Sequence, residues 1–400
     1  MKYQINPIHL IELLKEPTDI LQFKELYFKF KLQFNREHFL IVCDLLQNYN
    51  DRIEKINIFA DICNNWICFE EKKVSELVLI LKTAAKLKIN HHIIKRIYDE
   101  IKYSYKVFNP QNIVDITWAS AVLNINDPEI LKYLIESIKT NYKLFNGINI
   151  STIIWSCAVL NIDNSDLILY IINSIKSNYQ LFNAQCISNI IWACAVLNIQ
   201  DYSLLHELVS IITCNYHLFN YQGITQIKQA FLFYDIKDPE IDKLFNSCKT
   251  DTPTISKFQQ SIGEICEYLG YAISYEVELF NGLYSGDIII EYKDRLLILE
   301  CDGPFHYLLD GTYNGSTKLR NKLYDKYGIN YLSISYFEFK STHKYLIADF
   351  IKNEIEKHYD RLFNVEPCKT SKKRSRSSSS DRDVKRPSSD RDVKRPRNQY

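Results

Sequence analysis

The sequence lacks the long apolar runs and leader segments that mark membrane and exported proteins. No stretch reaches the roughly 18 uninterrupted apolar residues that a membrane-spanning helix needs, because Asn, Ser or Thr interrupts the most apolar segments every few positions. The opening MKYQINPIHLIELLKEPTDI carries acidic residues early and has no compact apolar stretch ending in small residues, so we expect neither a signal peptide nor an Arg-rich transit peptide. This predicts a cytoplasmic protein with no membrane partner, an organelle being the alternative.

The sequence also lacks the paired ligands of a structural zinc site. It holds 11 cysteines but no CxxC pair. Cys157 and Cys194 occupy the same phase of an internal repeat among apolar neighbours, which is typical of reduced core thiols. Any metal would therefore have to bind through carboxylates.

No overall excess of one charge is present, since 49 Lys and Arg balance 48 Asp and Glu. The balance hides a basic tail, because residues 366–400 hold 12 basic and 5 acidic residues and leave 37 and 43 before them. The tail repeats DRDVKRP, cannot bury a core, and is expected to be disordered. It could contact RNA non-specifically, direct the protein to the nucleus, or act only as a solubilising linker.

A repeat of 37 residues runs through the middle of the chain. Trp118, Trp155 and Trp192 are 37 residues apart and open the phrases WASAVLNI, WSCAVLNI and WACAVLNI. A degraded copy follows with Gln229 in the Trp position, and a weaker one precedes them at TAAKLKI. Decayed terminal copies are typical of repeat arrays, in which the end units cap the stack.

Each repeat is predicted to form two helices. The first begins after an Asn that can cap its free N–H groups, and the second begins at Asp127-Pro128-Glu129 or its equivalent. The capping positions are Asn109, Asn146, Asn183 and Asn220. Two short helices cannot bury their apolar faces alone, so we expect an α-solenoid over residues 81–250 after a helical region at 1–80, with the repeated Trp residues in the packing.

One column of polar residues varies from repeat to repeat at the same phase of the first helix. Its members are Asp115, Thr152, Asn189 and Gln226. Varied hydrogen-bonding side chains on a solenoid are the arrangement by which one repeat reads one base of a single RNA strand. Residues 105–236 hold only 6 basic against 9 acidic residues, however, so a solvated face or a surface for a protein partner stays open.

The period ends near residue 253, and residues 255–360 are predicted to form a second domain. A helix is followed by three β-like runs, AISYEVELF, SGDIIIEY and RLLILECDG. A basic helix, STKLRNKLYDKYG, a strand, INYLSISYFEF, and a closing helix from about residue 344 to 358 complete the order. This order predicts a small mixed α/β sheet with helices on its faces.

Three carboxylates could converge on that sheet. Asp287 lies on one strand, and Glu300 and Asp302 flank Cys301 on the next, so both point to the same side. Such a cluster could hold Mg²⁺, with His306 as a general base or phosphate contact. The alternative is that Glu300 and Asp302 pair with Lys318 or Arg320, outside any catalytic site.

The basic helix carries a row of cations suited to phosphates. Lys318, Lys322 and Lys326 recur every four residues, with Arg320 nearby. Residues 255–360 hold 11 basic and 16 acidic residues, so any RNA contact would be local. A solvated helix face is the alternative.

The stretch DIIIEYKDRLLILECDGPFHY and the NGSTKLRNKLYDKYGINYLSISYFEF that follows resemble the RAP domain, and the 37-residue repeats resemble the heptatricopeptide repeats that accompany it. The resemblance implies an RNA-binding protein acting in RNA processing or stability. The RAP domain is similar to the PD-(D/E)xK restriction-endonuclease-like core, whose acidic positions correspond to Asp287 and Glu300. Where that pattern has Glu-x-Lys, this chain has Glu-Cys-Asp, and Lys318 or Lys322 could supply the missing ammonium. A metal-dependent endoribonuclease and a protein-interaction scaffold are the alternatives.

Overall fold

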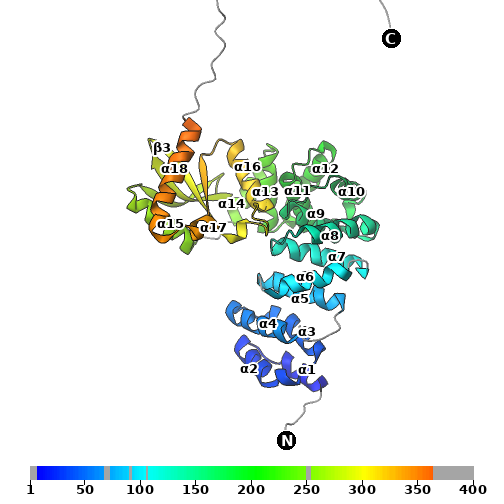
Figure 1. Cartoon of the computed structure of the whole chain (residues 1–400). Helices are drawn as coiled ribbons and strands as arrows, with labels where there is room; N and C mark the ends of the chain where they lie inside the picture. The colour runs from blue at the N-terminus through cyan, green and yellow to red at the C-terminus, as the bar shows by residue number, and fades with distance from the viewer. Residues whose placement is uncertain (1–6, 67–72, 90–91, 105–106, 249–253, 364–400) are drawn as a thin grey trace, which may run out of the picture. The chain divides into compact units, whose positions relative to one another are not determined.

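The computed structural model describes residues 7–66, 73–89, 92–104, 107–248 and 254–363 (Figure 1). The chain divides into a compact unit, Met1–Asn353, and a second unit, Glu354–Tyr400. The fold is mostly helical, with a small mixed sheet toward the C-terminus. None of the described helices is both long and apolar enough to cross a membrane. The basic tail predicted to be disordered lies outside the described residues.

Four helices precede the repeats: α1 (Pro7–Lys15), α2 (Ile20–Phe30), α3 (Arg36–Leu45) and α4 (Arg52–Trp66). Asp19 caps α2 and Asn35 caps α3 through side-chain oxygens that accept backbone N–H groups. Phe23, Tyr27 and Trp66 are fully buried between these helices. The helical character predicted for this region is therefore confirmed.

The repeats form pairs of helices, as the 37-residue period predicts. The first helices are α5 (Val74–Leu87), α7 (Pro110–Val122), α9 (Gly147–Val159), α11 (Ala184–Val196) and α13 (Tyr221–Phe233). The second helices are α6 (His92–Ser104), α8 (Pro128–Asn141), α10 (Ser165–Lys176), α12 (Tyr202–Cys214) and α14 (Pro239–Cys248). Each first helix packs mainly against the next first helix, so the five first helices form one layer, coloured cyan to green in Figure 1.

The ends of the first helices repeat as faithfully as their interiors. Each predicted Asn cap accepts a hydrogen bond from a backbone N–H two or three residues into its helix, as Asn146 does from Asn149 at 2.9 Å. Each of these helices is followed, within two residues of its end, by a residue in the left-handed conformation. These residues are Lys88, Asn124, Asn161, Asn198 and Asp235. Asn and Asp tolerate positive φ better than most residues, which explains why the Asn of the AVLNI phrase stops the helix.

The repeated Trp and Cys residues contribute to packing. Trp192 is 4% exposed, whereas Trp155 is half-buried, and their rings lie 6.5 Å apart at an angle of 33°. Cys157 and Cys194 are free and fully buried, and burial raises the pKa of each thiol to about 12. They are unreactive core thiols at neutral pH.

The sheet is mixed and has the order β1-β2-β3-β4. The strands are β1 (Ile273–Leu279), β2 (Tyr284–Tyr292), β3 (Arg295–Asp302) and β4 (Tyr331–Ser335). The first three pair antiparallel, and β4 runs parallel to β3 with Glu300 opposite Ser333. The helices are α15 (Lys257–Tyr268), α16 (Gly315–Lys326), α17 (Tyr336–Ser341) and α18 (Ile347–Phe363).

One predicted strand is shorter than expected. The run INYLSISYFEF is a strand only as far as Ser335, and α17 then begins with the Ser335 side chain accepting the Phe337 N–H. An alternating apolar pattern does not show where a strand stops, whereas a Ser at the junction can cap a helix. The rest of the α-β-β-β-α-β order is as predicted.

Candidate functional site

Helix α16 lies across the C-terminal ends of the repeat helices. Its Gly315 lies so close to α9 that a Cβ there would be 2.1 Å from the carbonyl oxygen of Ala158. Further along, Lys322 Nζ donates to the carbonyl of Val196 at 2.9 Å, and Lys326 Nζ donates to that of Phe233 at 2.6 Å. Successive turns of α16 thus meet the ends of α9, α11 and α13. Cations are stabilised there because the last carbonyls of a helix carry partial negative charge.

The left-handed Asn residues of the repeats also contact the second domain, residues 255–360, which we call the sheet module. Asn124 Nδ2 donates to the carbonyl of Phe305 at 2.9 Å, and Asn161 Nδ2 donates to that of Tyr313 at 2.6 Å. At the last repeat, Asp235 replaces Asn and pairs with Lys326 at 2.8 Å. The same position of each of these repeats therefore holds a different part of the module.

Most of the cations predicted to bind phosphate are engaged within the protein. Lys322 and Lys326 are engaged with the repeat helices, and Arg320 is only 7% exposed. Lys318 is half-buried and forms no ion pair among the described residues. Lys322 and Lys326 thus bond to the repeat helices, and Arg320 bonds to Glu300 and Asp302. Of the four predicted cations, Lys318 alone keeps its charge available for a phosphate.

The predicted carboxylates surround Arg320. The guanidinium donates to Glu300 at 2.8 Å and to Asp302 at 2.9 Å, and the hydroxyl of Tyr324 donates to the second oxygen of Glu300 at 2.9 Å. Asp287 accepts the Cys301 N–H at 2.6 Å. Of the two possibilities for Glu300 and Asp302, the structure therefore shows the pairing with Arg320.

Burial dominates the protonation of this cluster. It raises the pKa of Asp287 to about 6 and that of Glu300 to about 7, although Arg320 opposes the shift. His306 lies 3.2 Å from Asp302 and 3.1 Å from the Thr317 hydroxyl, and burial lowers its pKa. The imidazole is therefore neutral at pH 7.

These residues do not fit a Mg²⁺ ion. Both oxygens of Glu300 are already hydrogen-bonded, and a guanidinium occupies the space where a metal would sit. One buried oxygen, Asp302 Oδ2, has no partner, but a divalent ion needs about six oxygen ligands. Among the described residues, no group of three His, Cys, Asp or Glu side chains could hold a metal.

The polar column predicted to read bases is bonded across repeats at one end, and its last member, Gln226, is only 8% exposed. Gln226 Nε2 donates to Asn189 Oδ1 at 3.0 Å across α11 and α13, and Gln185 donates to the same oxygen at 3.1 Å. At the other end, Asp115 pairs with Lys82 of the preceding repeat at 2.9 Å. The column is thus a strip of polar side chains that crosses the helix layer.

Two cavities open along this strip. Asp115 and Thr152 line one of about 340 Å³, together with Lys82 and Trp118. Gln226 lines the other, of about 610 Å³, which lies between the repeat helices and the sheet module. Together the two cavities include three of the four residues of the column.

Three residues of the larger cavity were not singled out from the sequence. Arg52 belongs to α4, Lys88 ends α5, and Phe305 lies in the short turn η7 (Pro304–His306). They are separated by up to 253 residues in the chain, so no local pattern could have brought them together. The one sequence signal is that Lys88 stands where the three following repeats have Asn, at a position with positive φ.

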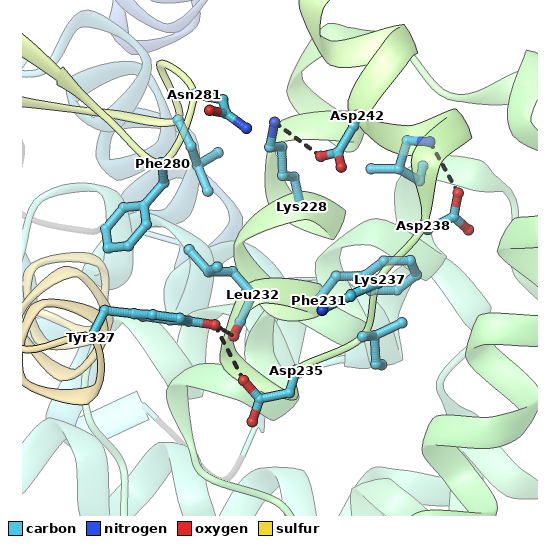
Figure 2. A pocket seen from close by; sticks show the side chains of 13 residues that line it. Lys228, Phe231, Leu232, Asp235, Lys237, Asp238, Asp242, Phe280, Asn281 and Tyr327 are labelled. Carbon is cyan, nitrogen blue, oxygen red and sulfur yellow. Dashed lines mark hydrogen bonds and ion pairs between the residues drawn. The ribbon is translucent and has the colours of Figure 1, made fainter.

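A third cavity, of about 340 Å³, lies between α13 and the turn after β1 (Figure 2). Its polar groups mostly pair with one another. Lys228 contacts Asp242 at 3.1 Å, and the Tyr327 hydroxyl donates to Asp235 and to the Leu232 carbonyl (Figure 2). Most of its charged groups are thus paired within the protein, so we do not regard it as the functional site.

The sequence matches no protein-family model and no curated protein.

Proposed function

We propose that the protein binds single-stranded RNA through an α-solenoid formed by its 37-residue repeats, with the strand following the polar column. The observation that carries this proposal is the hydrogen bond from Gln226 to Asn189, which joins two members of the column across neighbouring repeats. The other members, Asp115 and Thr152, line a cavity on the same layer of helices. Side chains that differ from one repeat to the next suit the reading of unpaired bases. Gln226 is buried, and the other three members are half-buried.

Local positive charge supports an RNA ligand although the repeats are acidic overall. Lys82, Arg52 and Lys88 line the two cavities, and the last two form no ion pair among the described residues. Phosphate contacts therefore come from Arg52, Lys88 and Lys318. Lys82 already pairs with Asp115, and Arg320 is buried. The resemblance of the C-terminal part to RAP and nuclease-like modules is consistent with a role in RNA processing or stability.

Cleavage by the sheet module is not part of this proposal. The acidic cluster that would bind the metal of an endoribonuclease is neutralised by Arg320. We infer that the module, a restriction-endonuclease-like domain by resemblance, helps to position RNA.

The test is selection of RNA by the full chain from a random pool of single-stranded oligonucleotides, with a DNA pool alongside. The affinity of the selected RNA should fall as salt rises, with a slope of about −0.7 per phosphate contact on logarithmic scales. Asn189→Ala should relax the preference at one base position by about 1 kcal/mol, roughly fivefold. Asn57→Ala, on the exposed face of α4, is the matched control and should leave the preference unchanged.

Failure to enrich any RNA would refute the proposal and would favour a peptide as the partner of the repeats. Enrichment that is indifferent both to salt and to Asn189→Ala would equally contradict it.

A further inference from the structure

The larger cavity differs in composition from the rest of the chain. Its lining includes two cations, Arg52 and Lys88, and no carboxylate, although acidic residues outnumber basic ones before the tail. It also contains three aromatic rings, those of Trp155, Trp192 and Phe305. A ligand that satisfies both features is anionic and has a flat aromatic ring.

The backbone of Phe305 is held by hydrogen bonds while its side chain is exposed. Its carbonyl oxygen accepts two hydrogen bonds, from Asn124 Nδ2 at 2.9 Å and from Asn314 Nδ2 at 2.8 Å. The side chain is nevertheless 67% exposed. The ring therefore lines the cavity from an anchored backbone position and is open to a ligand that stacks on it.

The cavity also offers a free hydrogen-bond donor. The indole Nε1 of Trp192 can only donate, and it lies 2.8 Å from Gln229 Oε1. This contact fixes the amide of Gln229 and leaves its Nε2 donors for another acceptor. Gln229 stands where the three preceding repeats have Trp, so the last repeat replaces a ring with an amide.

We propose that this cavity binds one unpaired nucleotide of the RNA strand. The base stacks on Phe305 and Trp155 and accepts a hydrogen bond from Gln229, while Arg52 and Lys88 contact the flanking phosphates. The inference rests on the proposed function and adds to it a single anchor position, built jointly by the repeats and the sheet module. Base stacking on aromatic side chains and phosphate contacts by cations are the usual components of such a site.

The test uses the full chain and the oligonucleotide that it selects from the random pool. Each base is replaced in turn by an abasic site, and the affinity of each version is measured. One position should lose between about fivefold and about 150-fold in affinity, the range of one stacked base. With Phe305→Ala, the loss at that position should shrink, because only Trp155 and Gln229 still contact the base, while the losses at other positions remain.

Leu309→Ala is the matched control, because Leu309 is a 62% exposed apolar residue of the same module that does not line the cavity. Arg52→Gln should lower the affinity of every version and reduce the salt slope by about 0.7. Lys132→Gln, on the exposed face of α8, should do neither.

The outcomes separate the two proposals. If no RNA is selected, both fail. If RNA is selected but Phe305→Ala leaves the abasic pattern unchanged, the anchor is refuted and RNA binding stands. Tight binding of a free nucleoside monophosphate that the oligonucleotide does not displace would also overturn the anchor, because the cavity would then serve a small molecule.

Discussion

The contact between α16 and the repeat helices makes Gly315→Ala an informative perturbation. The added Cβ would lie 2.1 Å from the Ala158 carbonyl oxygen and 2.8 Å from a methyl group of Val196. Ordinary contacts of this kind are above about 3.4 Å, and the atom approached most closely belongs to the backbone of α9. Helix α16 must therefore move away from the repeats by more than 1 Å, a distance that hydrogen bonds do not survive.

The magnitude follows from the contacts along α16. The displacement would break the bonds of Lys322 to Val196, of Lys326 to Phe233 and of Asn161 to Tyr313. Three hydrogen bonds at about 0.5–1.5 kcal/mol each give a loss of about 1.5–4.5 kcal/mol. We take the lower half of that range as the expected value, because both lysine side chains are partly in water.

Urea denaturation followed by tryptophan fluorescence and far-UV circular dichroism measures the loss. The control is Gly303→Ala, since Gly303 has an ordinary φ of −68° and no atom within 4 Å of an added Cβ. Gly303→Ala should leave the urea midpoint unchanged or raise it slightly. Equal midpoints for the two variants would refute the idea that α16 is tightly docked on the repeats.

Two further predictions concern the buried cluster. Arg320→Met should lower the free energy of unfolding by about 3–5 kcal/mol at pH 8, because it leaves two buried carboxyl groups, Glu300 and Asp302, without their cation. Lys318→Met is the control, and a loss no larger in Arg320→Met than in this control would contradict the prediction. In the unchanged protein, stability should fall as pH rises from about 4 to about 7, since the raised pKa values of Asp287 and Glu300 mean that the folded chain retains protons that the unfolded chain has released. Urea midpoints across this range measure the slope, which Glu300→Gln should flatten; an unaltered slope in this variant would assign the dependence to other groups.

The helices of the repeats were largely predictable because their signals are local. Asn146 followed by an apolar run specifies a capped start, and Asn161 in a left-handed conformation specifies the stop, each through contacts within a few residues. The strands were found for the same reason, except where Ser335 turned the last one into a helix.

The role of the basic helix could not be predicted in this way. The spacing of Lys322 and Lys326 shows that they share a face, but not what that face contacts. Their partners are carbonyl groups about 90 to 130 residues away, and carbonyls leave no trace in the side-chain pattern. For the same reason, the convergence of Arg52 and Phe305 on one cavity is a property of the tertiary fold alone.

The matching of α16 to successive repeats restricts how this chain can change in length. Gly315, Lys322 and Lys326 contact three neighbouring repeats in order, at α9, α11 and α13. The distances between these residues along α16 therefore match the distances between the repeat helices. Inserting or deleting a repeat between α9 and α13 would separate Lys322 and Lys326 from the helix ends that they contact. Repeats added before α5 would leave this register untouched. The contacts of α16 therefore fix the number of repeats from α9 to α13. Before α5, the position of Arg52 in the larger cavity is the remaining constraint.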